Sequence, residues 1–411
     1  MSTITELPCV ENTPERLCAR ARIARTISGR IMRNIPARVE LAPGEVLGDE
    51  AARVVIEVPN PAGLFTRMGH EPIIGFGDSY MAGDWKAGAG TDLGAALTVF
   101  AERITTAIPQ WVQRLSVLVA RRPPRRHRNT LSGARRNIEA HYDLSNDLFR
   151  AFLDPSLTYS SALFDDSRPW AEQTLEEAQL RKVDSALDLA RVGPGQRILE
   201  IGTGWGTLAI RAAQRGAHVT TLTLSKEQAA LAAARAREAG VAHMIDFRLQ
   251  DYREATGTFD AVVSVEMIEA VGEEYWQTYF HTIDRLLAPG GTAVVQSILM
   301  RHDRYLATRR SHSWIQKHIF PGGIIPSVKA IRRRTARTTL VITDQKHFGL
   351  HYAETLRRWR ATFNEQWPEI RTLGFDESFR RMWELYLAYS ESGFATDYLD
   401  VAQIRLERAA A

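Results

Sequence analysis

Cysteine is nearly absent from this chain of 411 residues: the only two, Cys9 and Cys18, both lie near the N-terminus. Two cysteines are too few for the disulfide scaffold of a small secreted domain, and their positions do not suggest a cysteine-based metal site. We therefore expect no metal centre. Such sparse use of cysteine is typical of proteins of the reducing cytoplasm.

Long apolar runs are also missing, because no uninterrupted apolar segment approaches the ~18 residues that a membrane-spanning helix needs. The first six residues are too polar for a secretory signal. We therefore expect a cytoplasmic protein without a membrane span. If its substrate is a lipid, the protein has to act from outside the bilayer, peripheral to the inner face of the membrane.

The net charge of +4 is small, so the distribution of charge says more about partners than the total. Residues 121–128 contain five arginines and two prolines, and Arg332, Arg333, Arg334 and Arg337 form a second basic cluster. The first cluster is either a solvated connector or a contact for the phosphate headgroups of an anionic membrane. Interleaved aromatic residues and nucleic-acid modules are missing there, which disfavours nucleic acid as a partner.

The length accommodates two domains, each with its own core. We expect a small mixed α+β domain over residues 1–120, a basic linker over 121–130 and a second domain over 131–411. Apolar strand patterns and helical patterns alternate between residues 197 and 298. This alternation predicts an α/β fold with a doubly wound, mostly parallel sheet, and the aromatic-rich stretches 351–367 and 377–392 predict a helical C-terminal cap.

The most informative stretch is 197–206, where an apolar strand runs into a glycine-rich bend with Glu200 just before it. Glycine lacks a Cβ atom, so the backbone at Gly202 and Gly204 can approach a ligand closely. The pattern E-x-G-x-G-x-G is typical of S-adenosylmethionine-dependent methyltransferases. A dinucleotide-binding dehydrogenase is the competing interpretation, but its third glycine comes one position later and its second strand ends in an acid.

Three further stretches carry a resemblance to a known family: 141–147 with 159–162, then 264–272, and 320–323 with 352–359. Together they resemble the cyclopropane-fatty-acyl-phospholipid synthases, a family that includes mycolic acid methyltransferases and fatty-acyl methylene synthases. The likeness covers residues 130–395 and, more weakly, 35–120. It implies the class I S-adenosylmethionine methyltransferase fold.

The resemblance also implies a reaction. S-adenosylmethionine would donate a methyl group to the cis double bond of an acyl chain on a phospholipid, through a carbocation. Direct proton loss closes a cyclopropane, whereas loss after a hydride shift leaves a methylene branch. We expect the methylene product, the precursor of a 10-methyl branch, and a flavin-dependent reductase as a partner that reduces it.

Residues for the cofactor follow from the resemblance position by position. Tyr159 and Ser160 would hold the cofactor from above, and Gly202 and Gly204 would lie under its methionine part. Thr223, Leu224 and Gln228 match contacts on the ribose side, and Asp251 and Tyr252 match contacts to the adenine. Thr223 with Leu224, and Asp251 with Tyr252, could instead be ordinary structural residues at the ends of strands.

In cyclopropane synthases the base is a bound bicarbonate, and the resemblance carries its cage onto Glu269, Ile298, Tyr352, Ser161 and Gln296. Ser161 stands where the family has cysteine and Gln296 where it has histidine, so a titratable imidazole is lost. Serine and glutamine can still hydrogen-bond an anion. Either bicarbonate remains in a rearranged cage, or a carboxylate acts as the base: Glu269 first, then Asp143 or Asp147.

Three other functions remain open from the sequence. A methyltransferase for a small soluble molecule would need a compact polar pocket in place of the aromatic, apolar and basic stretch 299–337, which we interpret as a lid or access wall. A non-catalytic lipid-binding protein would not need the glycine bend. The third is the dehydrogenase discussed above. A homo-oligomer is compatible with all of them.

Overall fold

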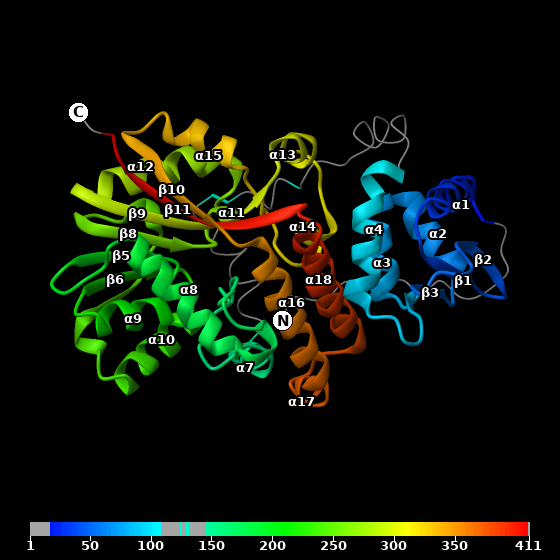
Figure 1. The fold of residues 1–411 in the computed structure, drawn as a ribbon, viewed down its shortest axis with the longest axis horizontal. Coiled ribbons are helices and arrows are strands. Elements are labelled where there is room, and N and C mark those ends of the chain that lie inside the picture. Colours follow the sequence, from blue (N-terminus) through cyan, green and yellow to red (C-terminus); the bar gives the residue numbers. More distant parts are fainter. Residues whose placement is uncertain (1–16, 108–123, 125–128, 131–132, 134–144, 410–411) are drawn as a thin grey trace. The chain divides into compact units, whose positions relative to one another are not determined.

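The computed structural model describes residues 17–107, 124, 129–130, 133 and 145–409, which fall into two compact units (Figure 1). The first unit comprises residues 17–107 together with Ser311–Ile319 and Trp359–Thr396. The second comprises the remaining described residues, including Phe320–Arg358 and a C-terminal segment that starts at Asp397. The sequence had placed all residues after 130 in one domain, whereas two later segments pack with the N-terminal unit.

The first unit combines a small sheet with helices. Its sheet has the strand order β2-β1-β3-β4, in which β1 is parallel to β3 and the other pairs are antiparallel. Its strands are β1 (Arg38–Leu41), β2 (Glu45–Gly48), β3 (Val55–Val58) and β4 (Lys86–Ala87). Its helices are α1 (Ala19–Met32), α2 (Pro61–His70), α3 (Pro72–Met81), α4 (Leu93–Ala107), α14 (Trp314–His318), α17 (Trp367–Thr372) and α18 (Glu377–Ala395).

Aromatic residues explain why the late segments join this unit. Helix α18 packs against α3 and α4, and its Trp383 is fully buried, as is Trp85 beside α3. Tyr80 of α3 donates a hydrogen bond of 2.9 Å to Glu384 of α18. Burying large aromatic surfaces is strongly favourable. The predicted C-terminal helices therefore exist, but α18 completes the core of the N-terminal unit.

The second unit contains a seven-stranded sheet of order β10-β11-β9-β8-β5-β6-β7. Strands β7, β6, β5, β8 and β9 are parallel, and β11 and β10 add an antiparallel edge. The strands are β5 (Arg197–Ile201), β6 (His218–Thr223), β7 (Ile245–Leu249), β8 (Phe259–Val265), β9 (Leu287–Met300), β10 (Leu340–His347) and β11 (Leu399–Arg408). This is the predicted doubly wound, mostly parallel sheet.

Helices cover both faces of this sheet. The helices are α7 (Asn146–Phe152), α8 (Leu175–Leu189), α9 (Thr207–Gln214), α10 (Lys226–Glu238), α11 (Ile268–Val271), α12 (Trp276–Leu286), α13 (His302–Thr308) and α15 (Val328–Thr335), and α16 (Gly349–Glu365) begins in this unit. One apolar cluster joins the sheet to α12 and α15, and a second joins it to α8, α9 and α10. These two separate apolar cores, one on each face, bury the central strands from both sides.

Strand β11 is the main element that the sequence did not predict. It reads Leu399 to Arg408 with charged residues at both ends, yet Val401 and Ile404 are fully buried because β11 lies between β9 and β10. The arginine-rich segment 121–128, apart from Pro124, and the motif residues 141–144 lie outside the described residues. Within the described ranges, no helix is both long enough and apolar enough to cross a bilayer.

Candidate active site

The glycine bend follows β5 as predicted, and its backbone takes the left-handed conformation that glycine permits. Gly202 has φ of +100° and Gly204 has φ of +50°. A Cβ atom on Gly204 would meet no atom within 4 Å, so this part of the bend faces open space. Trp205 anchors the bend, because its indole N–H donates 2.8 Å to the Asn146 side chain of α7.

Glu200, the acid before the bend, is buried at the end of β5. Its carboxyl accepts a hydrogen bond from Thr221 Oγ1, and that hydroxyl lies 2.7 Å from Thr203 Oγ1. Burial raises the pKa of Glu200 to about 8, against the opposing effects of Thr221 and the nearby Lys182. The two neighbouring strands β5 and β6 thus hold a hydrogen-bonded acid under the bend.

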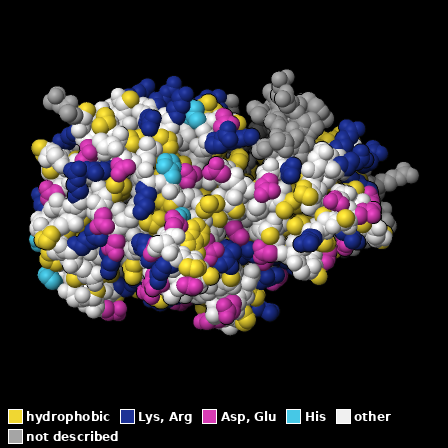
Figure 2. All heavy atoms as spheres, viewed as in Figure 1, with side chains coloured by type: hydrophobic (Ala, Val, Ile, Leu, Met, Phe, Trp, Pro, Cys, Tyr) yellow, Lys and Arg dark blue, Asp and Glu magenta, His cyan; other side chains and the backbone are white. Residues whose placement is uncertain are grey.

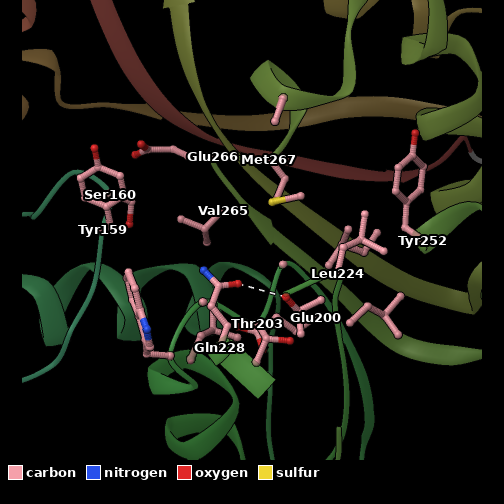
Figure 3. A pocket seen from close by; sticks show the side chains of 18 of the residues that line it. Tyr159, Ser160, Glu200, Thr203, Leu224, Gln228, Tyr252, Val265, Glu266 and Met267 are labelled. Atoms are coloured by element: carbon pink, nitrogen blue, oxygen red, sulfur yellow. Dashed lines mark hydrogen bonds between the residues drawn. The ribbon is translucent and has the colours of Figure 1, made fainter. Parts of the chain in front are cut away.

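The end of β6 and the start of α10 form the next part of the site. Ser225 caps α10 by accepting from the Gln228 backbone N–H, as expected for an N-cap serine. Thr223 Oγ1 donates 3.0 Å to Gln228 Oε1, which turns the Gln228 amide toward the strand end (Figure 3). The turn therefore places polar side chains at the position where a dinucleotide-binding fold would carry an acid.

Asp251 and Tyr252 follow β7. Arg253 Nη2 pairs with the buried Asp251 carboxylate at 2.6 Å, and Arg253 Cζ lies 5.6 Å from the centroid of the Tyr252 ring. Burial raises the pKa of Tyr252 above its usual value near 10. The tyrosine is therefore a neutral aromatic surface, with the Asp251–Arg253 ion pair beside it.

All nine predicted cofactor residues line one cavity at the carboxyl ends of the parallel strands, where ligands bind in open α/β sheets. Figure 3 shows Tyr159, Ser160 and Glu266 together at one end of this cavity and Tyr252 at the other. The residues brought together are Tyr159, Ser160, Gly202, Gly204, Thr223, Leu224, Gln228, Asp251 and Tyr252.

Lys182, which sequence reasoning missed, is a buried cation on α8 that also lines this cavity. Its ammonium donates 2.6 Å to Ser160 Oγ. Burial lowers the pKa of Lys182 to about 8, although Glu266, Asp154 and Glu200 act in the opposite direction. One positive charge thus compensates part of the negative charge of the carboxylates around the cavity.

The predicted cage residues do meet, but three of them converge on Glu266 and not on Glu269. Glu266 Oε1 accepts from the Ser161 backbone N–H at 2.9 Å and from Gln296 Nε2 at 2.8 Å. Tyr352 donates its hydroxyl hydrogen to Glu266 Oε2 at 2.7 Å. The Ser161 hydroxyl itself donates to the Ala162 carbonyl, so the serine contributes its backbone rather than its side chain.

Glu269 lies beside this group and has different partners. Its Oε1 accepts 2.8 Å from Ser297 Oγ and 2.6 Å from the Ile298 backbone N–H, as the resemblance implied for Ile298. Its Oε2 is buried and accepts no hydrogen bond from the described residues. Burial, followed by the charge of Glu266, raises the pKa of Glu269 to about 8, so this group is largely a neutral acid at pH 7.

Of the two reserve candidates for the base, Asp147 does not line the cavity and Asp143 lies outside the described residues. The Asp147 side chain is 64% exposed in the first turn of α7 and pairs with Arg150 at 3.3 Å. Glu266 was missed because the resemblance pointed to Glu269, three residues later. An acid directly after the buried strand β8 is itself a signal, because functional groups in such sheets follow the strands.

The fold and this cavity define a class of protein: an S-adenosylmethionine-dependent methyltransferase. More narrowly, the chain belongs to the family described as mycolic acid cyclopropane synthetase, which matches residues 129–404.

Individual relatives agree with the family. The chain is 46% identical to tuberculostearic acid methyltransferase UfaA1 of Mycobacterium tuberculosis, over 98% of this chain and 95% of that protein. It is 33% identical to the cyclopropane-fatty-acyl-phospholipid synthase of Escherichia coli, over 86% and 87%. The crystal structure of CmaA1 complexed with SAH and CTAB matches 67% of this chain and 98% of its own, with a TM-score of 0.61 and 30% identity.

Proposed function

We propose that this protein transfers a methyl group from S-adenosylmethionine to the cis double bond of an unsaturated acyl chain on a phospholipid and releases a methylene-branched chain. The observation that carries the proposal is one cavity that is lined by the glycine bend and has Glu266, hydrogen-bonded to Tyr352, at one end. The similarity to UfaA1 along almost the whole chain supports the substrate class.

The cavity fits the methyl donor, which is a cation at sulfur. Asp251 and Glu266 line it, and carboxylates favour a positive ligand. The aromatic ring of Tyr252 at one end suits the adenine, and the open bend at Gly204 suits the methionine part. Residues Tyr159, Ser160 and Glu266 at the other end would then hold the sulfonium.

Bound S-adenosylmethionine supplies an electrophilic methyl, which the π electrons of the alkene take as the carbon–sulfur bond breaks. The alkene is the nucleophile, so the chain does not need an activated serine or cysteine. The protein positions both reactants, excludes water that would capture the cation, and removes one proton. Tyr159, with rings of Phe149 and Phe152 around it, contributes an aromatic wall to that end.

We further propose a membrane surface as the partner, approached from the cytoplasmic side. The α15 basic cluster (Lys329, Arg332, Arg333 and Arg337) is exposed, and Figure 2 shows Lys and Arg side chains gathered near α15. Each basic residue near an anionic surface contributes about 1 kcal/mol of attraction. A flavin-dependent reductase that converts the methylene to a methyl branch, and self-association, belong to the same proposal.

Mass spectrometry of lipids tests this function. The protein is incubated with methyl-labelled S-adenosylmethionine and vesicles of phospholipids that carry cis-monounsaturated chains, with fully saturated vesicles as the control. We expect label in the unsaturated lipid only, in a chain one methylene heavier that takes up hydrogen on catalytic reduction under mild conditions. A product resistant to such reduction would be a cyclopropane and would contradict the methylene assignment. Label transferred only to a soluble molecule would contradict the lipid substrate.

A further inference from the structure

The hydrogen-bond donors around Glu266 and Glu269 are already used by the protein. The Ser161 N–H, the Gln296 amide and the Tyr352 hydroxyl all donate to Glu266, and the Ile298 N–H donates to Glu269. These are the groups that the resemblance assigned to a bound bicarbonate. Because their hydrogens are directed at the carboxyl groups of Glu266 and Glu269, these donors do not fit a further anion, which would also lie against the carboxylate of Glu266.

We propose that the Glu266 carboxylate takes the place of bicarbonate and is the base that removes the proton from the methylated acyl chain. The inference rests on the proposed function, whose reaction requires a base. A carboxylate and a bicarbonate present the same planar pair of oxygens to donors, so a side chain that reaches this position satisfies the same cage. Glu266 also lines the cavity, which gives it access to the reacting atoms.

The orientation of the Gln296 amide supports the assignment, because it is fixed by a chain of hydrogen bonds. Gln403 Nε2 donates 3.0 Å to the Lys182 carbonyl, which can only accept, so the Gln403 amide has one orientation. The same nitrogen donates 3.1 Å to Gln296 Oε1. The oxygen of Gln296 therefore faces Gln403, and its N–H groups face Glu266.

Backbone geometry at Glu266 points the same way. Its φ is +51°, in the left-handed region that favours glycine and costs other residues roughly 1–2 kcal/mol. A glutamate at such a position, immediately after β8, needs its side-chain contacts to hold it there. Strained backbone that is stabilised by surrounding contacts is common at functional sites.

Electrostatics divides the two acids into different roles. Glu269 is largely protonated at neutral pH, because burial and the charge of Glu266 raise its pKa to about 8. Glu266 has Lys182 nearby and three hydrogen-bond donors, all of which favour its ionised form, while burial raises its pKa. Burial thus makes Glu266 a stronger base than an exposed glutamate, which suits proton removal.

The proton transfer balances without another reactant. After methyl transfer and a hydride shift, the carbon that bears the new methyl carries the positive charge. Glu266 takes a proton from that methyl, the electrons of the broken C–H bond form the exocyclic C=C bond, and the carboxylic acid later returns the proton to water. Without the hydride shift, the same proton loss closes a cyclopropane, so the base is needed for either product.

Two substitutions test the role of Glu266 in activity. Glu266→Gln keeps the size but loses the base, and Glu266→Gly suits the positive φ and opens space for an anion. In buffer freed of carbon dioxide and with saturating S-adenosylmethionine, we expect each to lower turnover on unsaturated vesicles by about 10²–10⁴-fold. Added bicarbonate or formate should raise the rate of Glu266→Gly at least ~10-fold and leave Glu266→Gln and the wild type unchanged. Glu238→Gln, an exposed glutamate on α10, is the matched control and should behave as wild type.

A binding measurement separates this inference from the proposed function. Nuclear magnetic resonance with carbon-13 bicarbonate should detect a bound anion in Glu266→Gly and none in the wild type. A wild type that binds stoichiometric bicarbonate, or that loses activity when carbon dioxide is removed, would overturn the inference, as would full activity of Glu266→Gln. A wild type that excludes bicarbonate but methylates no vesicle would instead contradict the lipid substrate and leave the replacement of the anion supported.

Discussion

Replacing Gly202 by alanine tests how the glycine bend is built. The φ of Gly202 is +100°, and an added Cβ would lie 2.6 Å from Met267 Cγ and 2.7 Å from its Sδ. The backbone conformation costs a residue with a Cβ about 1–2 kcal/mol. Displacing the Met267 side chain costs about 1–3 kcal/mol more. We expect Gly202→Ala to lower the free energy of unfolding by about 2–5 kcal/mol in total.

Gly204→Ala is the matched control, because it has the same chemistry two residues away. Its φ is +50°, and the added Cβ would meet nothing within 4 Å, so only the conformational cost of about 1 kcal/mol applies. Equilibrium urea unfolding, followed by tryptophan fluorescence and analysed at a common m-value, compares the two variants with wild type.

The double variant Gly202→Ala/Met267→Ala measures the part of this loss that comes from the steric clash between the new Cβ atom and the Met267 side chain. Because the clash is gone in the double variant, its free energy of unfolding should be about 1–3 kcal/mol higher than the sum of the two single changes predicts. Calorimetry should also show weaker S-adenosylmethionine binding in Gly202→Ala, since Met267 lines the cavity and is pushed within it. Equal stability of the two alanine variants, with no coupling in the double variant, would refute the close approach of Met267 to the bend.

Three further predictions concern single groups. The free energy of unfolding should vary less with pH in Glu269→Gln than in the wild type. In the folded protein the pKa of Glu269 is raised from 4.5 to about 8. The protonated side chain therefore stabilises the fold fully below pH 4.5, and this stabilisation is lost as the pH rises through 8. Urea titrations at pH 5 and 8 should show wild type losing about 3–5 kcal/mol more than the variant. Arg360→Met should cost about 3–5 kcal/mol, because this guanidinium is 8% exposed and pairs with two carboxylates, whereas Arg357→Met on the same helix, 53% exposed, should cost less than ~1 kcal/mol in the same assay. Ser225→Ala should remove the cap of α10 and lower the unfolding free energy by about 1 kcal/mol, measured by thermal unfolding.

Local patterns predicted the parallel part of the sheet well. The stretch 197–201 is an apolar run that ends in glycines, and a strand followed by a bend and a helix is what such a run forms. They could not predict where α18 packs: its apolar face only indicates that it is buried, and the partners, α3 and α4, lie about 300 residues earlier in the chain. Strand β11 was missed because its burial comes from its two neighbouring strands.

The candidate site also has a part that the sequence predicted and a part that only the structure revealed. Through the family resemblance, the sequence alone named nine cofactor residues, and all nine line one cavity, whereas Lys182 and Glu266 of the same cavity were not named. Only the tertiary structure decided which carboxylate the cage surrounds. Ser161, Gln296 and Tyr352 come from three distant segments, and their hydrogen-bond donors converge on Glu266 because of where β8, β9 and α16 place them. A hydrogen bond is set by distance and direction in space, and no sequence pattern contains that information for residues so far apart.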